Sequence, residues 1–335
     1  MKLKIGVLGA GHLGKIHLKC IQMSSAFDLV GFYDPDENNI KNVVETFHIK
    51  AFDTAEALMD AVDVIDIVTP TITHFNLAKQ AAFKNKHIFI EKPLTHTVSE
   101  AKTLMNLVHK QGVKVQVGHV ERFNPAFLAL GDIPVSPMFV EAHRLATFNP
   151  RGTDVSVVLD LMIHDIDLIL HLVQSEVKSI HASGVSVVSA TPDIANARIA
   201  FKNGCVANLT ASRLSLKQMR KVRLFQQDAY ISLDFLDKSA QIIRLLDENM
   251  VRTLHQAGSM TEGGNLIPLE TPKGTKYIEI NMPEPQSVNA ILMELETFAD
   301  CIQHNKTPRV TIEDGYKALK VAHRIIEAIG DTKVS

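Results

Sequence analysis

The sequence predicts an α/β protein with an N-terminal doubly wound parallel sheet and a C-terminal α/β domain that has a large, mostly antiparallel open sheet. Over the first 120 residues, short apolar runs alternate with longer stretches of helical spacing. After about residue 121, strand-like runs follow one another directly. A length of 335 residues is typical of two domains. We therefore expect one domain over residues 1–121 and a second over 122–335.

In the N-terminal region, the expected strands are short enough to be buried on both faces. They are Lys4–Leu8, Leu29–Tyr33, Val64–Val68, His87–Ile90 and Lys114–Val117. A helix is expected over Thr97–Lys110, because its apolar residues fall on one face. Strands that alternate with helices predict a parallel sheet joined by right-handed crossovers.

The C-terminal region begins with an expected helix over Val157–Leu172. Strand-like runs follow at Lys178–Ser189, Ala195–Phe201, Cys205–Ser212 and Lys221–Phe225. Asn203–Gly204 separates two of these runs and predicts a hairpin. The three glycines of Gly258–Asn265 indicate a loop, and closing helices are expected at Asn289–Ile302 and Gly315–Ile329. This order predicts an open antiparallel sheet with helices on one side.

Composition excludes several classes of function. With 35 Lys plus Arg against 37 Asp plus Glu, the net charge is −2, which is atypical of nucleic-acid binders and of proteins that bind anionic membranes. The three cysteines form no CxxC pair, which argues against a disulfide framework or a cysteine zinc site. No apolar run is long enough to cross a membrane, and glycines interrupt the apolar N-terminus. We expect a protein of the reducing cytoplasm.

A glycine-rich turn follows the first expected strand. Gly9, Gly11 and Gly14, with His12 and Leu13 between them, fit the pattern G-x-G-x-x-G. The first glycine allows the tight turn, the second lets a pyrophosphate approach, and the third lets helix and strand pack closely. Amides at the helix N-terminus then bind the phosphates. The alternative is a tight turn without a ligand, because the motif alone is weak.

Asp34 closes the second expected strand, 25 positions after Gly9. A carboxylate there can accept hydrogen bonds from the ribose hydroxyls of a dinucleotide, and it would repel a 2′-phosphate. This favours NAD over NADP as the cofactor. The alternative is a simple turn residue before Pro35.

Three side chains suit proton transfer at a hydroxyl. Lys92 follows a strand whose carboxyl end should face the ligand crevice, although an ordinary solvated lysine is an equal alternative. Asp160 and His164 are four apart in a helical stretch, and Asp167 extends the same face. A carboxylate can orient the imidazole for acid–base work. A core histidine and a metal site including Asp165 are competing interpretations, but no strong ligand spacing supports a metal.

Together these residues resemble the Gfo/Idh/MocA oxidoreductases over essentially the full chain. The resemblance rests on GAGHLG at 9–14, Asp34, Thr69-Pro70 with His74, Glu91-Lys92-Pro93, and the D-x-x-x-H-x-x-D pattern that begins at Asp160. It implies a Rossmann domain that binds NAD through the first three of these features and through Glu91 and Lys92. It also implies hydride transfer between a sugar carbon and nicotinamide, with Lys92 on the reacting hydroxyl and Asp160 with His164 as the acid–base pair.

A narrower resemblance is to dehydrogenases that oxidise the 3-hydroxyl of UDP-N-acetylglucosamine. It rests on VGHVERFNP at 117–125 and on Arg151 followed by DVSVVLDLMIHDID at 154–167. It implies substrate contacts by Arg122, Arg151 and Asp167. Guanidinium groups suit a diphosphate, and Arg144 is a further candidate, with a solvated sheet rim as its alternative. His119 stands where many family members have Asn.

Two other functions stay open at this point. One is an NAD-dependent dehydrogenase of a free sugar or inositol, and the other is a dinucleotide-binding regulator without turnover. An open sheet leaves a face to cover, so we expect a homodimer or homotetramer.

Overall fold

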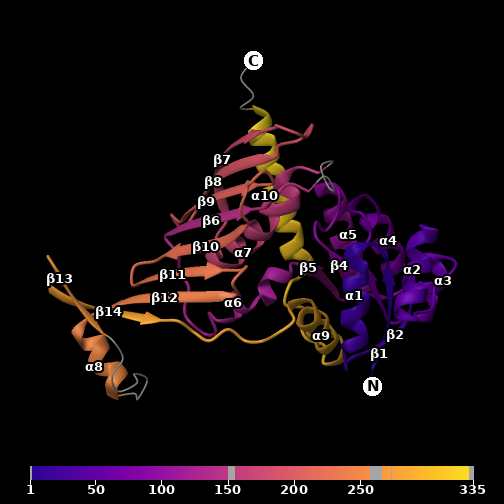
Figure 1. Ribbon diagram of the computed structural model, residues 1–335, viewed down its shortest axis with the longest axis horizontal. Coiled ribbons are helices and arrows are strands. Elements are labelled where there is room, and N and C mark those ends of the chain that lie inside the picture. Colours follow the sequence, from indigo (N-terminus) through magenta and orange to yellow (C-terminus); the bar gives the residue numbers. More distant parts are fainter. Residues whose placement is uncertain (1, 150–154, 257–265, 273, 332–335) are drawn as a thin grey trace. The chain divides into compact units, whose positions relative to one another are not determined.

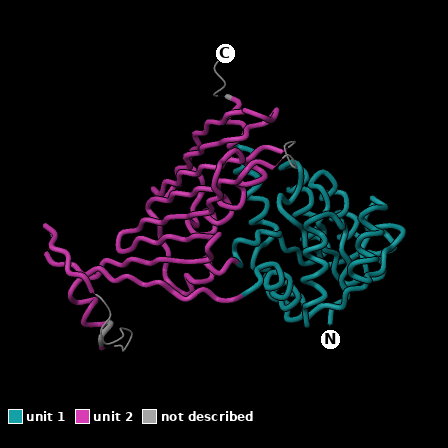
Figure 2. The backbone as a smooth tube through the Cα atoms, in the orientation of Figure 1, with its two compact units in different colours: residues 1–123, 288–324 teal, residues 124–287, 325–335 magenta. Residues whose placement is uncertain are grey.

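A computed structural model of the chain describes residues 2–149, 155–256, 266–272 and 274–331. The chain forms two compact units (Figure 2). Unit 1 comprises residues 1–123 and 288–324, and unit 2 comprises 124–287 and 325–335. The expected division put everything after residue 121 into one domain. In the structure, residues 288–324 pack with the N-terminal residues, for a reason that lies in the core of unit 1.

Unit 1 is built on a five-stranded parallel sheet in the order β2-β1-β3-β4-β5 (Figure 1). The strands are β1 Leu3–Leu8, β2 Phe27–Tyr33, β3 Val64–Ile67, β4 His87–Glu91 and β5 Val115–Gly118. All five match expected runs, and they are rich in residues buried on both faces, as parallel strands require. Strand order reverses between β1 and β3, which is where α/β sheets bind ligands.

Five helices connect or flank these strands: α1 His12–Met23, α2 Glu37–Phe47, α3 Ala55–Ala61, α4 Thr71–Phe83 and α5 Val98–Gln111. Local signals explain their ends. Thr97 caps α5 in a capping box with Glu100, and Gly112 ends it in the left-handed region. The expected helix over Thr97–Lys110 is confirmed to within one residue at each end.

Helix α9, Ala290–Gln303, completes the core of unit 1. Its Leu295 and Phe298 belong to the same buried cluster as the β1 side chains, and the Gln116 side chain donates to the Glu294 carbonyl at 2.7 Å. The start of α10, Ile312–Asp331, lies close enough that a Cβ on Gly315 would touch Val117. Burial of this apolar surface explains why residues 288–324 join unit 1.

Unit 2 contains a nine-stranded, mostly antiparallel sheet in the order β13-β14-β12-β11-β10-β6-β9-β8-β7 (Figure 1). Among the strands that the structure describes in this sheet, only β6 and β9 pair in parallel. Buried and more exposed residues alternate along β6, β8 and β11, as expected for a sheet with one open face. The strands are β6 Phe139–Leu145, β7 Val177–Val185, β8 Ile194–Phe201, β9 Val206–Ser212, β10 Met219–Phe225, β11 Ala229–Asp234, β12 Ser239–Leu246, β13 Ile267–Thr271 and β14 Gly274–Asn281.

The expected hairpin is confirmed, since β8 and β9 pair antiparallel around Gly204, whose φ is +91°. The expected loop over Gly258–Asn265 lies outside the described residues. The remaining helical segments are η1 Val120–Phe123, α6 Pro125–Leu128, η2 Val158–Met162, α7 Ile163–Val173 and α8 Glu248–Gln256. Within the described parts of the chain, no helix is both long and apolar enough to span a bilayer.

Candidate functional site

The glycine turn between β1 and α1 has the shape that a dinucleotide needs. Gly9 has a φ of +96°, and a Cβ on Gly14 would lie 2.0 Å from the Gly9 carbonyl oxygen, so both positions exclude larger residues. A Cβ on Gly11 would meet nothing within 4 Å, which leaves space for a pyrophosphate. No side chain caps α1, and its first turn holds no acidic residue. The turn therefore fits the phosphates of NAD.

Asp34 is tied to this turn. One carboxylate oxygen accepts the Ala10 amide at 2.6 Å, and the other accepts the amide of Asp36 at 2.8 Å. Asp34 is therefore both the turn residue and the acidic residue beside the glycine loop. Its position at the end of β2 is the one from which a carboxylate can reach ribose hydroxyls. Discrimination against NADP stays a prediction.

The ends of β3 and β4 are linked through His74. Its ring nitrogens lie 2.9 Å from the Thr69 carbonyl oxygen and 3.0 Å from that of Pro93. Burial lowers the pKa of His74, although both carbonyls oppose that shift. This geometry gives the ring a structural role in holding the two loops together. Direct cofactor contact by Thr69, Pro70 or His74 stays a prediction.

Lys92 follows β4 and is half-buried, and its contact with a reacting hydroxyl stays a prediction. Its amide donates to the carboxylate of the preceding Glu91 at 3.1 Å. Glu91 is buried, with its carboxyl group against the Cα of Gly118, where a Cβ would be only 2.6 Å from the nearest oxygen. The Lys92 amide is thus bonded to a carboxylate, that of Glu91, which itself has little space because it lies against Gly118.

The acid–base candidates of unit 2 lie where helical geometry changes. The expectation of one regular helix over Val157–Leu172 is wrong at its start, because residues 158–162 form a π-helical turn. The buried pairs Val157–Val158 and Met162–Ile163 are five residues apart, a spacing that suits the wider turn better than the α-helical 3.6. π-Turns are frequent at functional sites. Asp160 lies in this turn.

His164 lies in the first turn of α7, and both it and Asp160 are half-buried. Asp167, one turn further along, is buried. The structure thus places all three on consecutive turns of unit 2, while the expectation that they share one face stays a prediction. No group of three or more His, Cys, Asp or Glu in the described residues is arranged to hold a metal ion.

Arg144 and Asp165 form a buried bidentate ion pair. The guanidinium reaches both carboxylate oxygens, at 2.8 to 3.2 Å. A solvated sheet rim is therefore the wrong interpretation of Arg144, which is 3% exposed. The pair joins α7 to β6, so Asp165 fixes the helix that carries His164.

The other arginines differ in how far the structure describes them. Arg122 is 2% exposed and lies 3.5 Å from Asp314, both within unit 1. This geometry favours a structural role, and substrate contact by Arg122 stays a prediction. Arg151 lies outside the described residues.

Two further clusters of buried polar side chains were not predicted from the sequence. His17 is buried on α1 between Asp66 and Glu91, and it shares the 14, 17, 18, 21 face of the helix with apolar residues. A polar residue on that face is the signal that could have revealed it.

The second group lies next to the π-turn of unit 2. Arg213 donates to the Val155 carbonyl, and Asp193 accepts three backbone amides near by. This second group has no local sequence signal.

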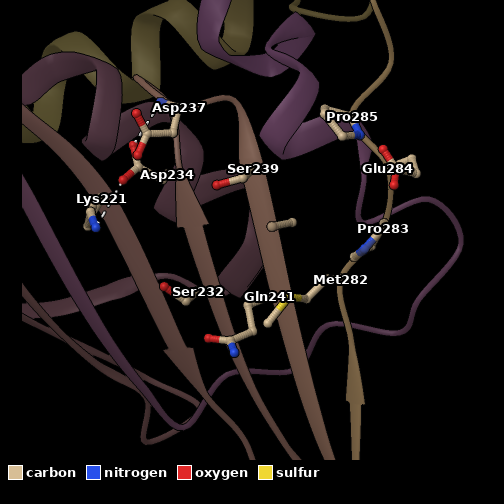
Figure 3. Close-up of a pocket in the computed structure, with 11 residues that line it drawn as sticks. Lys221, Ser232, Asp234, Asp237, Ser239, Gln241, Met282, Pro283, Glu284 and Pro285 are labelled. Carbon is tan, nitrogen blue, oxygen red and sulfur yellow. Dashed lines mark hydrogen bonds and ion pairs between the residues drawn. The ribbon is translucent and has the colours of Figure 1, made fainter. Parts of the chain in front are cut away.

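A separate pocket of about 430 Å³ lies in unit 2 beside β10, β11 and β12 (Figure 3). The other wall of the pocket is formed by four consecutive residues, Met282, Pro283, Glu284 and Pro285. Inside the pocket, the Lys221 Nζ atom lies 3.0 Å from an Asp234 carboxylate oxygen. None of the predicted site residues lines this pocket.

Comparisons with known proteins agree with the geometry. A family model for the oxidoreductase family with an NAD-binding Rossmann fold, Gfo/Idh/MocA, matches residues 3–119. The model of the Gfo/Idh/MocA C-terminal domain matches residues 137–231. The chain is 38% identical to UDP-N-acetylglucosamine 3-dehydrogenase of Acidithiobacillus ferrooxidans over 241 residues, which are 72% of this chain and 76% of that protein.

A crystallised chain of that Acidithiobacillus dehydrogenase is 31% identical, with a TM-score of 0.85 and 99% of each chain covered. The scyllo-inositol 2-dehydrogenase (NAD(+)) of Bacillus subtilis is 28% identical over 96% of this chain and 92% of that protein. Scyllo-inositol dehydrogenase from Lactobacillus casei, solved with NAD(H) and scyllo-inositol, shares the fold with a TM-score of 0.76 at 19% identity, over 99% and 98% of the two chains. The cofactor is NAD, the chain is a dehydrogenase, and it belongs to the Gfo/Idh/MocA family of oxidoreductases.

Proposed function

We propose that the chain oxidises the 3-hydroxyl of a UDP-N-acetyl sugar, UDP-N-acetylglucosamine, with NAD. The likeness to the Acidithiobacillus dehydrogenase carries this proposal, because it extends over 72% of the chain in sequence and 99% in structure. Lys92, Asp160 and His164 supply the proton-transfer groups that the reaction needs.

The proposed chemistry is a reversible alcohol oxidation. When bound, NAD supplies a nicotinamide ring that can take up or release a hydride. Lys92 donates a hydrogen bond to the substrate oxygen and offsets its developing negative charge. His164 removes the hydroxyl proton, and Asp160 orients the imidazole and stabilises its charged form.

The nucleotide part of the substrate is proposed to interact with Arg151, because a guanidinium can bind a diphosphate through two parallel hydrogen bonds. Asp167, on the turn after His164, is proposed to accept a hydrogen bond from a sugar hydroxyl. Binding energy from the remote nucleotide can orient the reacting carbon, so its loss should lower kcat as well as raise KM.

A second candidate is the oxidation of a free sugar or inositol. It is supported by the Bacillus scyllo-inositol dehydrogenase, which matches this chain over nearly its whole length. A non-catalytic dinucleotide-binding regulator is the remaining alternative, and it predicts NADH binding without turnover.

Steady-state kinetics distinguish these functions. NADH formation is followed by its near-ultraviolet absorbance with UDP-N-acetylglucosamine, free N-acetylglucosamine and scyllo-inositol. We expect the UDP-sugar to have by far the highest kcat/KM. Equal kcat/KM for the free and the UDP-linked sugar would reject the nucleotide-sugar proposal.

Two variants sharpen this test. Arg151→Ala should lower kcat/KM for the UDP-sugar more than for the free sugar, and Arg151→Lys should recover only part of the loss, because ammonium cannot form the paired hydrogen bonds. An equal loss for both sugars would remove Arg151 from the diphosphate site.

The same proposal includes a cytoplasmic location and assembly as a homodimer or homotetramer. The three buried cysteines form no disulfide, which suits a reducing compartment. Exposed apolar side chains at the β13–β14 end of the sheet, such as Ile267 and Ile280, suit contact with a second copy. Light scattering coupled to gel filtration measures the assembly, and a monomer would contradict it.

A further inference from the structure

A buried charge cluster lies behind Lys92 and has no role in the chemistry described so far. His17, on α1, and Asp66, in the centre of the parallel sheet, are both fully buried. The His17 Nδ1 atom lies 2.9 Å from an Asp66 oxygen, and its Nε2 lies 3.3 Å from a Glu91 oxygen. One imidazole thus bridges two carboxylates from neighbouring strands.

The cluster is arranged to hold charge at Glu91. Burial alone would lower the pKa of His17, but the two carboxylates outweigh it and raise that pKa well above its usual value. Burial opposes ionisation of Glu91, yet contact with His17 and the charge of Lys92 hold the Glu91 pKa below its usual value. For Asp66, burial prevails and the pKa is raised. A protonated His17 beside an ionised Glu91 is the arrangement that these shifts favour.

Glu91 passes this constraint to Lys92. One Glu91 oxygen faces His17, and the other accepts the amide of Lys92. The carboxyl group also lies against Gly118, where no side chain would fit. The rings of Phe89 and His17 pack in a T-shaped arrangement, with centroids 5.7 Å apart. The Lys92 backbone is therefore linked to His17 by one ion-pair contact at 3.3 Å and one hydrogen bond at 3.1 Å.

We propose that His17 is a positioning residue that acts through Glu91 to fix Lys92 for contact with the reacting hydroxyl. The inference rests on the proposed role of Lys92 and adds a residue that touches neither substrate nor cofactor. Since a small misplacement of a catalytic group can cost up to about a hundredfold in rate, the effect should be visible in kcat.

The test is a double-mutant cycle in the full-length protein. His17→Gln, Lys92→Ala and the double variant are compared with the wild type for kcat and KM, on whichever of the three alcohols the wild type turns over. NADH affinity is measured separately by fluorescence titration. We expect His17→Gln to lower kcat by roughly ten- to a hundredfold, with NADH affinity within about twofold.

The decisive result is the effect of His17→Gln when Lys92 is already absent. If His17 acts through Lys92, its substitution should then cause no further loss of kcat. An equal fold loss in both backgrounds would show a merely structural role and overturn the proposal. If Lys92→Ala keeps the wild-type kcat, the role of Lys92 in the proposed function fails as well, so the two failures are distinguishable.

Two further variants complete the design. His109→Gln is the matched control, because His109 also pairs with a carboxylate of unit 1, Glu313 at 2.6 Å, but at an exposed position. It should leave kcat unchanged. Should His17→Gln no longer bind NADH, Glu91→Gln takes its place in the same cycle. Glu91→Gln removes the charge but keeps a carbonyl oxygen for the Lys92 amide, and the same two outcomes support or overturn the proposal.

Discussion

Two histidines with carboxylate neighbours stand in opposite environments in the two units. His17 in unit 1 is fully buried, with both ring nitrogens facing carboxylates. His164 in unit 2 is half-buried at the start of α7, one turn after Asp160. A sealed imidazole cannot exchange protons with a substrate, whereas an accessible one can. The difference in exposure supports the proposed positioning role of His17 and the proposed proton transfer by His164.

The largest expected effect is on the accessible histidine. His164→Ala should lower kcat by roughly 10²–10⁴-fold, the usual contribution of a positioned proton-transfer group. NADH affinity and the melting temperature should change little, because His164 lies outside the NAD-binding domain and is not fully buried. Kinetics, fluorescence titration and thermal melts measure these quantities. A near-normal kcat in the folded variant would remove His164 from the chemistry.

Two glycines of the turn between β1 and α1 differ in a similar way, because a Cβ has no space at Gly14 and open space at Gly11. Gly14→Ala forces a Cβ against the Gly9 carbonyl and should lower the melting temperature together with NADH affinity. Gly11→Ala adds its Cβ in open space, so the melting temperature should hold while NADH affinity falls roughly tenfold or more. Similar losses of stability in both variants would contradict this assignment of the two positions.

Asp34 is expected to give a smaller change. NAD should bind more tightly than NADP, and Asp34→Ala should narrow that difference because the repulsion of a 2′-phosphate is lost. The variant also loses acceptors for the Ala10 and Asp36 amides, so NAD affinity itself should decline. Asp34→Asn, which keeps an acceptor without the charge, is the matched control for repulsion. Tighter NADP binding by the wild type would reject the prediction.

The smallest expected effect is the change in stability with pH that follows from the protonation of His17. Its folded-state pKa is raised, so the stability it contributes is fully present below about pH 6.5 and is lost as the pH rises through the raised value. The ¹⁵N chemical shifts of His17 should therefore report an imidazolium at neutral pH, and Glu91→Gln should lower the titration midpoint. A neutral His17 at pH 6 would contradict the charge assignment.

The difference between the two units also explains what could be predicted. The five parallel strands and α5 could be predicted because short apolar runs and apolar residues on one helical face are patterns among neighbouring residues. The GAGHLG turn and Asp34 could be recognised in the same way, from their spacing along the chain. The π-turn at Asp160 was missed, because a helix of regular spacing is the default expectation and the buried pairs five residues apart became visible only in the fold.

Sequence alone predicted the five parallel strands, the four strands β7 to β10 of unit 2, the glycine turn, and the residue types available for proton transfer, since each depends on patterns among residues close along the chain. The other five strands of unit 2 were not predicted. Tertiary structure decided which charged groups are buried and which remain accessible to solvent. His17 meets Asp66 across 49 positions, and Arg144 meets Asp165 across 21. It also decided that α9 packs into the core of unit 1. Such pairings depend on burial of distant segments against one another, and no local pattern encodes them.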